Sequence, residues 1–488
     1  MEKQSFRKTK VVATIGPASQ SPQVIEELLR AGVDVVRLNF SHGERNLHGQ
    51  VIRDVRAASK KLSRPVSILM DLQGPKIRVG RLIKPSIALK KGDKLLISAE
   101  DLDGDERMIS TTYADLYRDV KAGDRILMDD GLIEAKVKGV AGRVVECEVV
   151  YGGVLKEHKG MNLPGVNVSA PSLTDKDMED LDLGIGREVD YIALSFVRRR
   201  ADLVDLKRRI KDRGADIPVI AKIEKAEAIE DLDAILDEAD GIMIARGDLG
   251  VELSAEVIPI LQKKLISKAN EAGKIVITAT QMLESMIENA RPTRAEASDV
   301  ANAVFDGTDA LMLSGETAVG KYPVRAVEMM VRIAAEAEEA ALSQKHFLRR
   351  KKPQAGSFAQ AVAFAASAAS SEVNSKAIAV FTQTGDTARI LSKLRPSTRV
   401  VAFTPLEPTW RRLSLVWGVE PFMLEFGAHT DEMICRGEAA LLDNGVASLG
   451  DTIVIVSGTK VGMIGATNMM KIDWIGSEEC KLYIKEKK

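Results

Sequence analysis

Oppositely charged side chains stand close together at the end of an apolar stretch of this sequence. The segment IPVIAKIE, residues 217–224, alternates in the way that is typical of a β-strand, and the alternation places Lys222 and Glu224 on one face. Taken alone, such a pair is explained as well by a simple ion pair as by a functional site. The question is whether other chemically active residues occupy equivalent positions.

Polar side chains also end five other apolar runs. They are Arg37, Asn39, Ser41 and His42 on one run, Asp71 on the next, then Arg246 and Asp248, then Thr278, Thr280 and Gln281, and finally Ser314 and Glu316. Each has a structural alternative, because an aspartate before Leu-Gly can belong to a turn and serines often cap helices. Independent caps and turns, however, have no reason to gather at the same ends of one sheet.

The residue types of this set predict phosphoryl chemistry. Glu224 and Asp248 offer the hard oxygen ligands that Mg²⁺ prefers. Arg37 and Lys222 add positive charge, so the set suits an anion whose charge must be stabilised while it is transferred. Thr280 could position a water molecule or pass a proton. This hypothesis requires a fold that brings the five residues together.

Eight short apolar runs, most of them separated by amphipathic segments, organise the first two thirds of the chain. The runs start at Lys10, Asp34, Val66, Val189, Ile217, Asp240, Lys274 and Asp309. Repeated strand and helix units with nearly continuous apolar strands predict a parallel sheet covered on both faces, and eight units favour closure into a (β/α)₈ TIM barrel. An open doubly wound sheet is the alternative. In such barrels the active site lies at the carboxyl ends of the strands, where the polar residues stand.

Two further domains are predicted. About a hundred residues separate the third run from the fourth, and short alternating pieces with Gly-Asp and Asp-Gly turns indicate a small β-barrel domain inserted after strand 3. The polar, basic stretch HFLRRKKPQAGS, residues 346–357, marks the end of the barrel, and strands alternating with helices beyond it predict a C-terminal α/β domain. The predicted limits are 1–74 and 171–345 for the barrel, 75–170 for the insertion and 355–488 for the C-terminal domain.

Composition narrows the classes of partner. Lys+Arg total 69 against 70 Asp+Glu, a net charge of -1, so no overall field favours nucleic acid or an anionic membrane. The start MEKQSFRKTK lacks an apolar targeting segment and no apolar run is long enough to span a bilayer, so a cytoplasmic protein is expected. Cys147, Cys435 and Cys480 lie far apart in the sequence, which disfavours a disulfide framework and a zinc site and favours a reducing compartment.

Several long blocks of the sequence resemble one family. KVVATIGPAS, VVRLNFSHG, DLQGPKIRVG, AKIEKAEA, IMIARGDLG, ATQMLESM and RPTRAEASDVANAVFDGTDALMLSGETAVGKYP are similar to pyruvate kinases, and the likeness runs over nearly the full chain. It implies a barrel with a mobile inserted lid and a regulatory C-terminal domain, assembled as a homotetramer. It also implies transfer of the phosphoryl group of phosphoenolpyruvate to ADP, giving pyruvate and ATP in the final step of glycolysis, with Mg²⁺ or Mn²⁺.

The resemblance assigns roles to the charged residues. Lys222 would stabilise the phosphoryl group in flight and Arg37 would hold it. Glu224 and Asp248 would bind the divalent ion. Backbone amides near Gly247 and Asp248 would receive the substrate carboxylate, as the start of a helix can do for an anion.

By the same resemblance, Thr280 lies where the family positions the proton that converts the enolate to pyruvate. The donor itself could be water or Glu316, and Ser314 joins Glu316 among the expected substrate-binding residues. At the nucleotide side, Leu47 replaces an aromatic residue of the family pattern and Val319 replaces a lysine. That side would be lined by Asn39, His42, Arg78 and Lys176.

The monovalent-cation site of the family departs from its pattern in this chain. Its ligands would be the side chains of Asn39, Ser41 and Asp71 and the carbonyl of Leu72. Lys76, in DLQGPKIR, stands where potassium-dependent members carry glutamate, and Leu72 replaces a threonine. Because a tethered ammonium can supply the positive charge of potassium, the sequence predicts that K⁺ is not required.

The C-terminal domain contains a candidate effector site. The segment FTQTGDTARI follows an expected strand and opens a helix, so the hydroxyls and amides of Thr382, Thr384, Gly385 and Thr387 could bind the phosphate of an allosteric effector. Helix capping by Thr384 or Asp386 is the alternative.

Motion of the inserted domain is also predicted. The Gly-Pro step at 74–75 and the segment 164–171 are its expected hinges. They flank the insertion where it leaves the barrel, and closure would exclude water from the transfer.

Two other classes of function stay open at this point. A barrel aldolase or lyase could use Lys222 to form a Schiff base with its substrate. A non-catalytic sensor could use the C-terminal domain alone to bind a phosphorylated metabolite. The intact set of Arg37, Lys222, Glu224, Asp248 and Thr280 argues against a sensor without catalysis.

Overall fold

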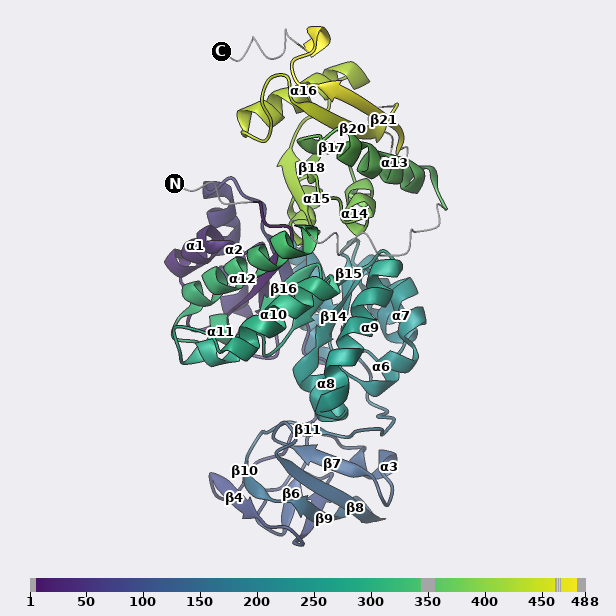
Figure 1. Ribbon diagram of the computed structural model, residues 1–488. Helices are drawn as coiled ribbons and strands as arrows, with labels where there is room; N and C mark the ends of the chain where they lie inside the picture. Colours follow the sequence, from purple (N-terminus) through teal and green to yellow (C-terminus); the bar gives the residue numbers. More distant parts are fainter. Residues whose placement is uncertain (1–5, 344–355, 461–462, 464, 466, 481–488) are drawn as a thin grey trace.

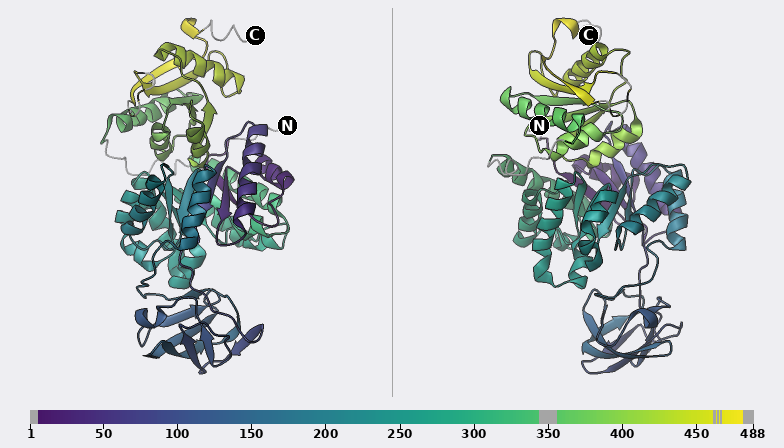
Figure 2. Two further views of the ribbon diagram at one scale, coloured as in Figure 1. Left: turned by 180° about the vertical axis from the view of Figure 1, so that it is seen from behind. Right: turned by 90° about the vertical axis from the view of Figure 1, so that its right-hand side faces the viewer.

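The computed structural model describes residues 6–343, 356–460, 463, 465 and 467–480, and its three parts lie in a row (Figure 1). A closed barrel is in the middle, a small β domain is at one end, and the C-terminal α/β domain is at the other. Views from behind and from the side show the same order (Figure 2). The β domain and the C-terminal domain therefore face opposite ends of the barrel.

Eight parallel strands close the barrel. They are β1 (Lys10–Ile15), β2 (Val35–Asn39), β3 (Ser67–Asp71), β12 (Tyr191–Leu194), β13 (Val219–Ile223), β14 (Gly241–Ala245), β15 (Ile275–Ala279) and β16 (Ala310–Leu313). The register pairs Lys10 with Ala310, which joins the first strand to the last. The predicted (β/α)₈ barrel is confirmed, and the open doubly wound sheet is excluded.

Helices cover the outside of the barrel. They are α1 (Pro22–Ala31), α2 (Arg45–Lys61), α4 (Asp175–Gly186), α5 (Arg200–Asp212), α6 (Ala226–Glu230), α7 (Leu232–Glu238), α8 (Arg246–Glu252), α9 (Ile258–Glu271), α10 (Arg294–Asp306), α11 (Gly315–Ala318) and α12 (Pro323–Ser343), with 3-10 turns η1 (Ala255–Val257) and η2 (Glu284–Ile287). Hydroxyl caps begin three of them, since Ser21, Thr174 and Thr293 accept hydrogen bonds from backbone amides of the first turn.

The alternation along each strand decides which side chains enter the barrel. On β13, Val219, Ala221 and Ile223 pack outward among the helices, whereas Ile220 belongs to the interior cluster. Lys222 comes two residues after Ile220, so it lies on the same face of the strand, near the carboxyl end. The pattern visible in the sequence is therefore the reason that a lysine reaches the mouth of the barrel.

The inserted domain follows β3 and has its own buried core. Its elements are β4 (Ser86–Leu89), β5 (Lys94–Ser98), β6 (Met108–Ser110), α3 (Leu116–Asp119), β7 (Arg125–Met128), β8 (Ile133–Ala141), β9 (Val144–Tyr151), β10 (Gly153–Lys156) and β11 (Met161–Asn162). One sheet has the order β11-β7-β8-β9-β5-β6, and β10 pairs with β4 in a second. The predicted β insertion is confirmed.

The C-terminal domain is a five-stranded sheet with helices on its faces. Its elements are α13 (Phe358–Glu372), β17 (Ala377–Phe381), α14 (Asp386–Lys393), β18 (Arg399–Thr404), α15 (Glu407–Arg412), η4 (Leu413–Leu415), β19 (Val419–Met423), α16 (Thr430–Asp443), β20 (Thr452–Gly458), β21 (Thr467–Trp474) and η5 (Glu478–Cys480). Four strands are parallel and match the predicted ones. The fifth, β21, pairs antiparallel at the edge of the sheet and was not foreseen.

Buried polar contacts fasten the C-terminal domain to the amino ends of the barrel strands. Arg395 lies 2.6 Å from Asp309, and Arg411 lies 2.8 Å from Asp190. The Tyr191 hydroxyl donates to the carbonyl of Arg412 at 2.9 Å. Because the amino ends are fastened to the C-terminal domain in this way, we expect a site that opens and closes at the carboxyl ends, which face the inserted domain.

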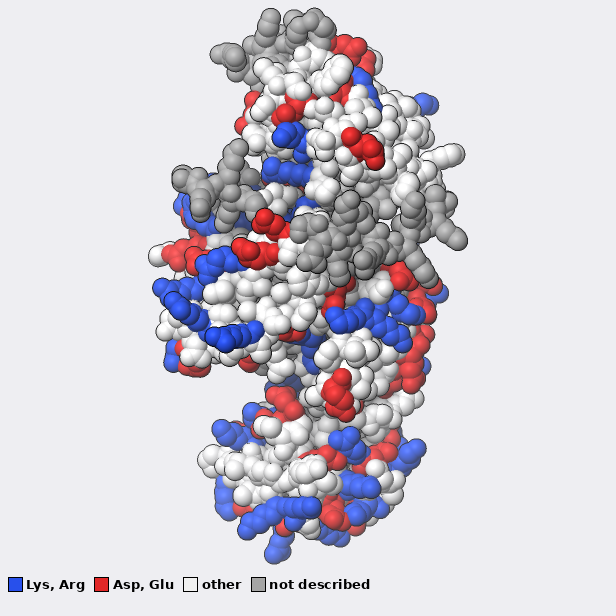
Figure 3. All heavy atoms as spheres, in the orientation of Figure 1, with Lys and Arg blue, Asp and Glu red and all other residues white. Residues whose placement is uncertain are grey.

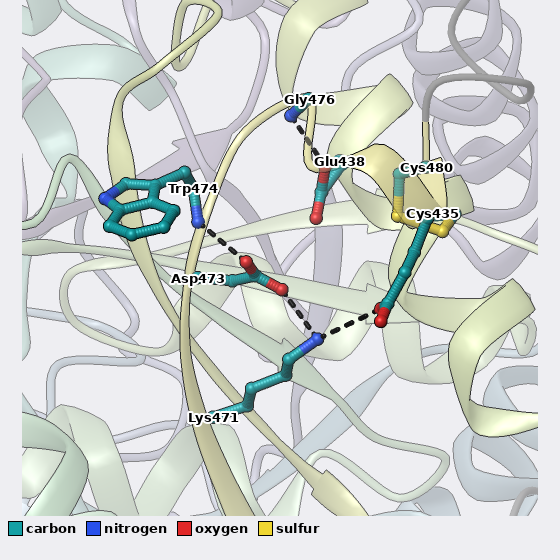
Figure 4. Close-up of a disulfide and its surroundings, with 8 residues drawn as sticks. Cys435, Glu438, Lys471, Asp473, Trp474, Gly476 and Cys480 are labelled. Carbon is teal, nitrogen blue, oxygen red and sulfur yellow. Dashed lines mark hydrogen bonds and ion pairs between the residues drawn. A yellow bond between two sulfur atoms is a disulfide. The ribbon is translucent and has the colours of Figure 1, made fainter.

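One expectation from the sequence is wrong: Cys435 and Cys480 form a disulfide (Figure 4). Their Cα atoms are 4.9 Å apart although the residues are separated by 45 positions. The pairing of β20 with β21 turns the chain back, so that η5 meets α16, and distance along the sequence could not reveal this. Cys147 is free and buried, and burial raises the pKa of its thiol to about 12.

The surface carries acidic and basic side chains interspersed over the barrel and the inserted domain (Figure 3). This agrees with the net charge of -1. In the described part of the chain, no helix has the length and apolar character needed to cross a bilayer. The basic run that begins at His346 lies outside the described residues up to Ala355, as does the predicted boundary there, and the limits proposed for the domains stay predictions.

Candidate active site

A continuous set of ion pairs occupies the barrel mouth that faces the inserted domain. The Lys222 Nζ atom lies 2.8 Å from Glu224 Oε1 and 3.3 Å from Asp71 Oδ1. Arg37 contacts the other oxygen of Asp71 at 2.6 Å. The four side chains come from β2, β3 and the end of β13 and are at most 12% exposed. The sequence-based expectation that cations and carboxylates converge here therefore agrees with their geometry.

The surroundings of Lys222 fix its charge. Burial acts to lower the pKa of the ammonium, but the carboxylates of Asp71 and Glu224 outweigh burial and raise the pKa above its ordinary value. The pKa of Asp71 is lowered in turn, because Lys222 and Arg37 outweigh the opposing effect of its burial. A Schiff-base lysine must be neutral to attack a carbonyl, so these surroundings disfavour the aldolase alternative.

Two hydroxyl residues complete this set, and sequence reasoning missed both. The Ser195 hydroxyl accepts a hydrogen bond from Lys222 at 2.8 Å and donates to the carbonyl of Leu72 at 2.6 Å. The Thr14 hydroxyl accepts from Arg37 at 3.0 Å. They lie at the ends of the two strands, β12 and β1, from which no polar residue had been chosen. The alternation would have found them, since Val12 and Ala193, two residues earlier, point into the barrel.

Asp248 lies in the first turn of α8, immediately after β14. Burial and the nearby charge of Glu224 raise the pKa of its carboxyl to about 6, against an opposing effect of Lys222. Glu224 is itself fixed, because its second oxygen accepts from the Phe196 amide at 2.8 Å. Two buried carboxylates that repel each other fit a divalent cation, which would relieve the repulsion and still leave positions for substrate oxygens and water.

Thr280 has a strained backbone, with φ +67° at a β-branched residue. Its hydroxyl accepts from the Gly247 amide at 2.8 Å and donates to the carbonyl of Ala279 at 2.6 Å. The amide expected to bind the substrate carboxylate is therefore hydrogen-bonded to the threonine in this structure. Arg246 holds the turn by donating to the carbonyl of Thr280 at 2.7 Å.

Glu316 and Ser314 lie at the end of β16. Glu316 is fully buried, and its two oxygens accept from the amides of Leu283 at 3.0 Å and Ser314 at 2.7 Å. The Ser314 hydroxyl is buried and has no hydrogen-bond partner among the described residues. Glu316 thus fixes the adjoining loops, and the role expected for both residues in substrate binding remains a prediction.

The predicted nucleotide side is electropositive. Burial lowers the pKa of His42, and the charges of Lys76, Arg78, Arg37 and Lys176 lower it further, so all four cations lie near this ring. Lys176 donates to the carbonyl of Phe40 at 2.6 Å and contacts Asp180. The side-chain oxygen of Asn39 accepts a hydrogen bond from the Ser41 amide at 3.1 Å. A polyphosphate suits such surroundings.

Two of the predicted monovalent-cation ligands are engaged within the protein. The Leu72 carbonyl accepts from Ser195, and Asp71 is shared by Arg37 and Lys222. Lys76 is exposed and has no ion-pair partner among the described residues. Its charge acts on both His42 and Asp248, which places the ammonium within electrostatic reach of the mouth.

Two connections, expected to act as hinges, join the inserted domain to the barrel, and hinge motion there stays a prediction. Gly74 has φ +67°, and a Cβ there would come within 3.0 Å of the Phe196 ring, so only glycine fits. On the return connection, Arg198 donates to the carbonyls of Val168 and Ala170, the latter at 2.7 Å. No helix or strand lies between β11 and α4, but Leu163 and Val166 belong to the buried core of the inserted domain and Leu173 to that of the barrel.

The predicted effector segment forms the start of α14. Gly385, with φ +85°, precedes the helix and donates from its amide to the Thr382 hydroxyl at 2.9 Å. The Thr387 hydroxyl lies 2.6 Å from that of Thr467. The side chains of Thr382, Thr384, Thr387 and Thr467, but not Gly385, line a cavity of about 80 Å³ between the α14 start and the segment after β20. Residues 461, 462, 464 and 466 of that segment lie outside the described residues.

A closed barrel with an inserted lid, and cations and carboxylates gathered at the lidded mouth, defines a class of barrel enzymes that bind an anionic substrate. Residues 6–327 match the family described as pyruvate kinase, barrel domain, and residues 360–473 match pyruvate kinase, alpha/beta domain. The chain belongs to the pyruvate kinase family. It is a phosphotransferase that converts phosphoenolpyruvate and ADP to pyruvate and ATP, and its family generally uses a divalent metal.

Individual relatives support this assignment. The pyruvate kinases of Staphylococcus aureus strains MRSA252 and USA300 are each 46% identical over 475 residues, covering 97% of this chain and 81% of theirs. The crystal structure of a pyruvate kinase from Cryptosporidium parvum superposes with a TM-score of 0.90 at 38% identity and covers 96% of both chains. The similarity therefore includes the lid and the C-terminal domain as well as the barrel.

Proposed function

We propose that the ion-paired set at the barrel mouth carries out the phosphoryl transfer, with Lys222 as the principal catalytic residue. The observation that carries the proposal is the position of its ammonium between Asp71, Glu224 and Ser195, which holds a positive charge at a fixed point. A preorganised cation needs no rearrangement as negative charge moves between substrate oxygens. Arg37 binds the phosphoryl group, and Asp71 positions both cations.

Glu224 and Asp248 hold the divalent metal, Mg²⁺ or Mn²⁺, in this proposal. When bound, the metal supplies further positive charge to the phosphoryl oxygens. The Gly247 and Asp248 amides receive the substrate carboxylate, after Gly247 releases the Thr280 hydroxyl. The freed hydroxyl of Thr280 then orders the water or acid that protonates the enolate. Asn39, His42, Arg78 and Lys176 bind ADP.

The experiment is an assay that couples ADP and phosphoenolpyruvate to pyruvate detection. Lys222→Met is expected to lower kcat by about 10³-fold, the typical effect of removing one preorganised charge stabiliser, with little change in KM. Glu224→Gln is expected to raise the Mg²⁺ concentration needed for half-maximal rate. Lys264→Met, at an exposed lysine of α9, is the matched control. Retention of activity within tenfold in Lys222→Met would contradict the assignment.

A finer part of the proposal concerns potassium. Lys76 provides the positive charge that a monovalent cation would bring, so the enzyme is expected to reach full activity in sodium-only buffer. Lys76→Glu should create a potassium requirement, whereas Lys91→Glu, at an exposed lysine of the lid, should not. Strong stimulation of the unchanged enzyme by K⁺ would reject this role.

Regulation and assembly complete the proposal. A phosphorylated effector binds at Thr382, Thr384, Gly385 and Thr387, the lid closes over the substrates, and the chain forms a homotetramer. The effector test measures activity at half-saturating phosphoenolpyruvate in the presence of a panel of sugar phosphates and nucleotides. The same measurement on Thr384→Ala shows whether any response depends on this site. Light scattering of the purified protein provides the test of the tetramer, and protection of the lid connections from protease by Mg²⁺ and substrate provides the test of closure.

A further inference from the structure

A large cleft separates the C-terminal domain from the barrel on the side opposite to the catalytic mouth. Its volume is about 1650 Å³. The barrel contributes the ends of α5 and α9 and the segments that lead into β13 and β15, and the C-terminal domain contributes α13, α14 and α15. Figure 1 shows α14 next to the barrel end that carries β15. We call this space the interdomain cleft. Clefts between domains are preferred places for small ligands.

Three cations line the interdomain cleft without a carboxylate partner. Lys211, at the end of α5, and Lys274, before β15, form no ion pair within the part of the chain that the structure describes. Arg412 donates to the carbonyl of Asp216 at 2.6 Å, and its Nε atom is buried without a partner among those residues. The interface arginines nearby differ, since Arg395 and Arg411 are each paired with an aspartate.

Two of the three cations, Lys274 and Arg412, are half-buried, whereas Lys211 is exposed. Burial lowers the pKa of the Lys274 ammonium against an opposing effect of Asp240. A buried donor without an acceptor on a guanidinium costs free energy that a bound anion would recover. The cations stand on separate elements around one space.

The rest of the lining combines charged and apolar side chains. Six basic residues, Lys207, Lys211, Lys274, Arg389, Lys393 and Arg412, outnumber four carboxylates, those of Asp216, Asp240, Glu271 and Asp386. Leu406 is 46% exposed, Ile390 is half-buried, and Ile217 and the ring of Tyr191 form part of the wall. An inorganic anion would leave these surfaces wet, whereas a ligand with an apolar body would cover them. The excess of basic over acidic side chains and the apolar surfaces together favour an occupant that is an anion with an apolar body.

We propose that the interdomain cleft is a second ligand-binding site, which takes an organic anion with an apolar body. Gln383, Thr384 and Asp386 line the cleft on one side and the small cavity at the start of α14 on the other. The strands that begin at the cleft, β13 and β15, end at Lys222 and Thr280. A ligand here contacts the elements that lead to both other sites.

The test uses 8-anilino-1-naphthalenesulfonate, a fluorescent aromatic sulfonate, with the full chain. The expected result is one saturable site that persists in the presence of saturating ADP, Mg²⁺ and inorganic phosphate. Lys211→Glu/Lys274→Glu should raise its Kd at least tenfold. Lys60→Glu/Lys264→Glu makes the same change of charge at exposed lysines outside the cleft and should leave the Kd unchanged.

A second variant tests the apolar part. Ile390→Trp fills the cleft from α14 and should also abolish the fluorescent complex while kcat in the absence of the probe stays within twofold. Displacement of the probe by ADP or phosphate would place it at another site and overturn the proposal. Equal affinity in the unchanged protein and both cleft variants would overturn it as well.

Discussion

Lys222 illustrates how single residues in this protein depend on their neighbours for chemistry. Its ammonium is kept charged by Asp71 and Glu224 and is aimed by the hydroxyl of Ser195. A lysine in water would have the charge but not the fixed direction. The surrounding acceptors therefore matter as much as the lysine.

The role of Ser195 can be measured. Ser195→Ala removes the acceptor that lies 2.8 Å from Lys222 and leaves both ion pairs in place. We expect kcat to fall about 10-fold to 100-fold while KM for phosphoenolpyruvate changes little, because orientation and not charge is lost. Steady-state kinetics check this, and thermal unfolding of the variant serves as the control. An unchanged kcat would show that Lys222 is held adequately by the carboxylates alone.

The metal affinity should depend on pH through Asp248. Its carboxyl has a pKa raised to about 6 by burial and by Glu224, and a cation binds the deprotonated form. Below pH 6 the proton competes, so the affinity for Mg²⁺ should fall by about tenfold per pH unit; above pH 7 it should be constant. Isothermal titration calorimetry between pH 5 and 8 measures it. In Asp248→Asn the affinity for Mg²⁺ should be weak at every pH. If the variant shows the same pH dependence of Mg²⁺ affinity as the unchanged protein, the assignment is contradicted.

Among the elements, the loops at the amino ends of the strands hold the fold together with buried charge. Asp34, just before β2, contacts Arg7 at 2.6 Å and Arg64 at 2.9 Å. Burial acts to raise the pKa of its carboxyl, but Arg7, Lys10 and Arg64 outweigh burial and lower the pKa to about 2. The ionised form is thus favoured by folding.

Asp34 should therefore make stability depend on pH. A lowered folded pKa contributes stability that is complete above about pH 4 and disappears as the pH falls to about 2. Asp34→Asn should lower the free energy of unfolding by about 2 kcal/mol at pH 7 and by much less near pH 2.5. Urea denaturation at the two pH values measures the difference. Asp182→Asn, which removes an exposed partner of Arg213, should cost under about 1 kcal/mol at either pH.

At the scale of the whole molecule, the two ends of the barrel differ in what they contact. The lid faces the carboxyl ends, where the charged residues of the site lie, and the C-terminal domain is fastened to the amino ends by buried ion pairs. We therefore expect movement at the inserted domain and a fixed attachment at the C-terminal domain. The disulfide adds a further restraint within the C-terminal domain, since the loop that it closes contains β20, β21 and residues that line the small cavity at the start of α14.

Reduction of this disulfide should destabilise the C-terminal domain. Closing a loop of 45 residues limits the unfolded chain by up to about 4 kcal/mol. Incubation with a phosphine reductant should lower the melting temperature of the protein, and Cys435→Ser/Cys480→Ser should melt at the lower temperature with or without reductant. If the unchanged protein melts identically in both conditions, the bond does not contribute to stability.

Sequence alone determined the barrel, the insertion and the positions of most of the charged residues. The reason is that strand alternation and helix periodicity are local, and the carboxyl ends of parallel strands always meet at one mouth. The same rule, applied to β1 and β12, would also have given Thr14 and Ser195. Family resemblance then supplied the reaction, which composition and spacing could not name.

Only the tertiary structure decided which side chains and amides already have a partner within the protein. It brought Cys435 to Cys480, gave both oxygens of Glu316 to backbone amides and hydrogen-bonded Gly247 to Thr280. It also left three cations at the interdomain cleft without an ion-pair partner among the residues that the structure describes. These outcomes depend on contacts between residues far apart in the chain. No local pattern encodes such distances, because they arise only when separate layers pack against one another.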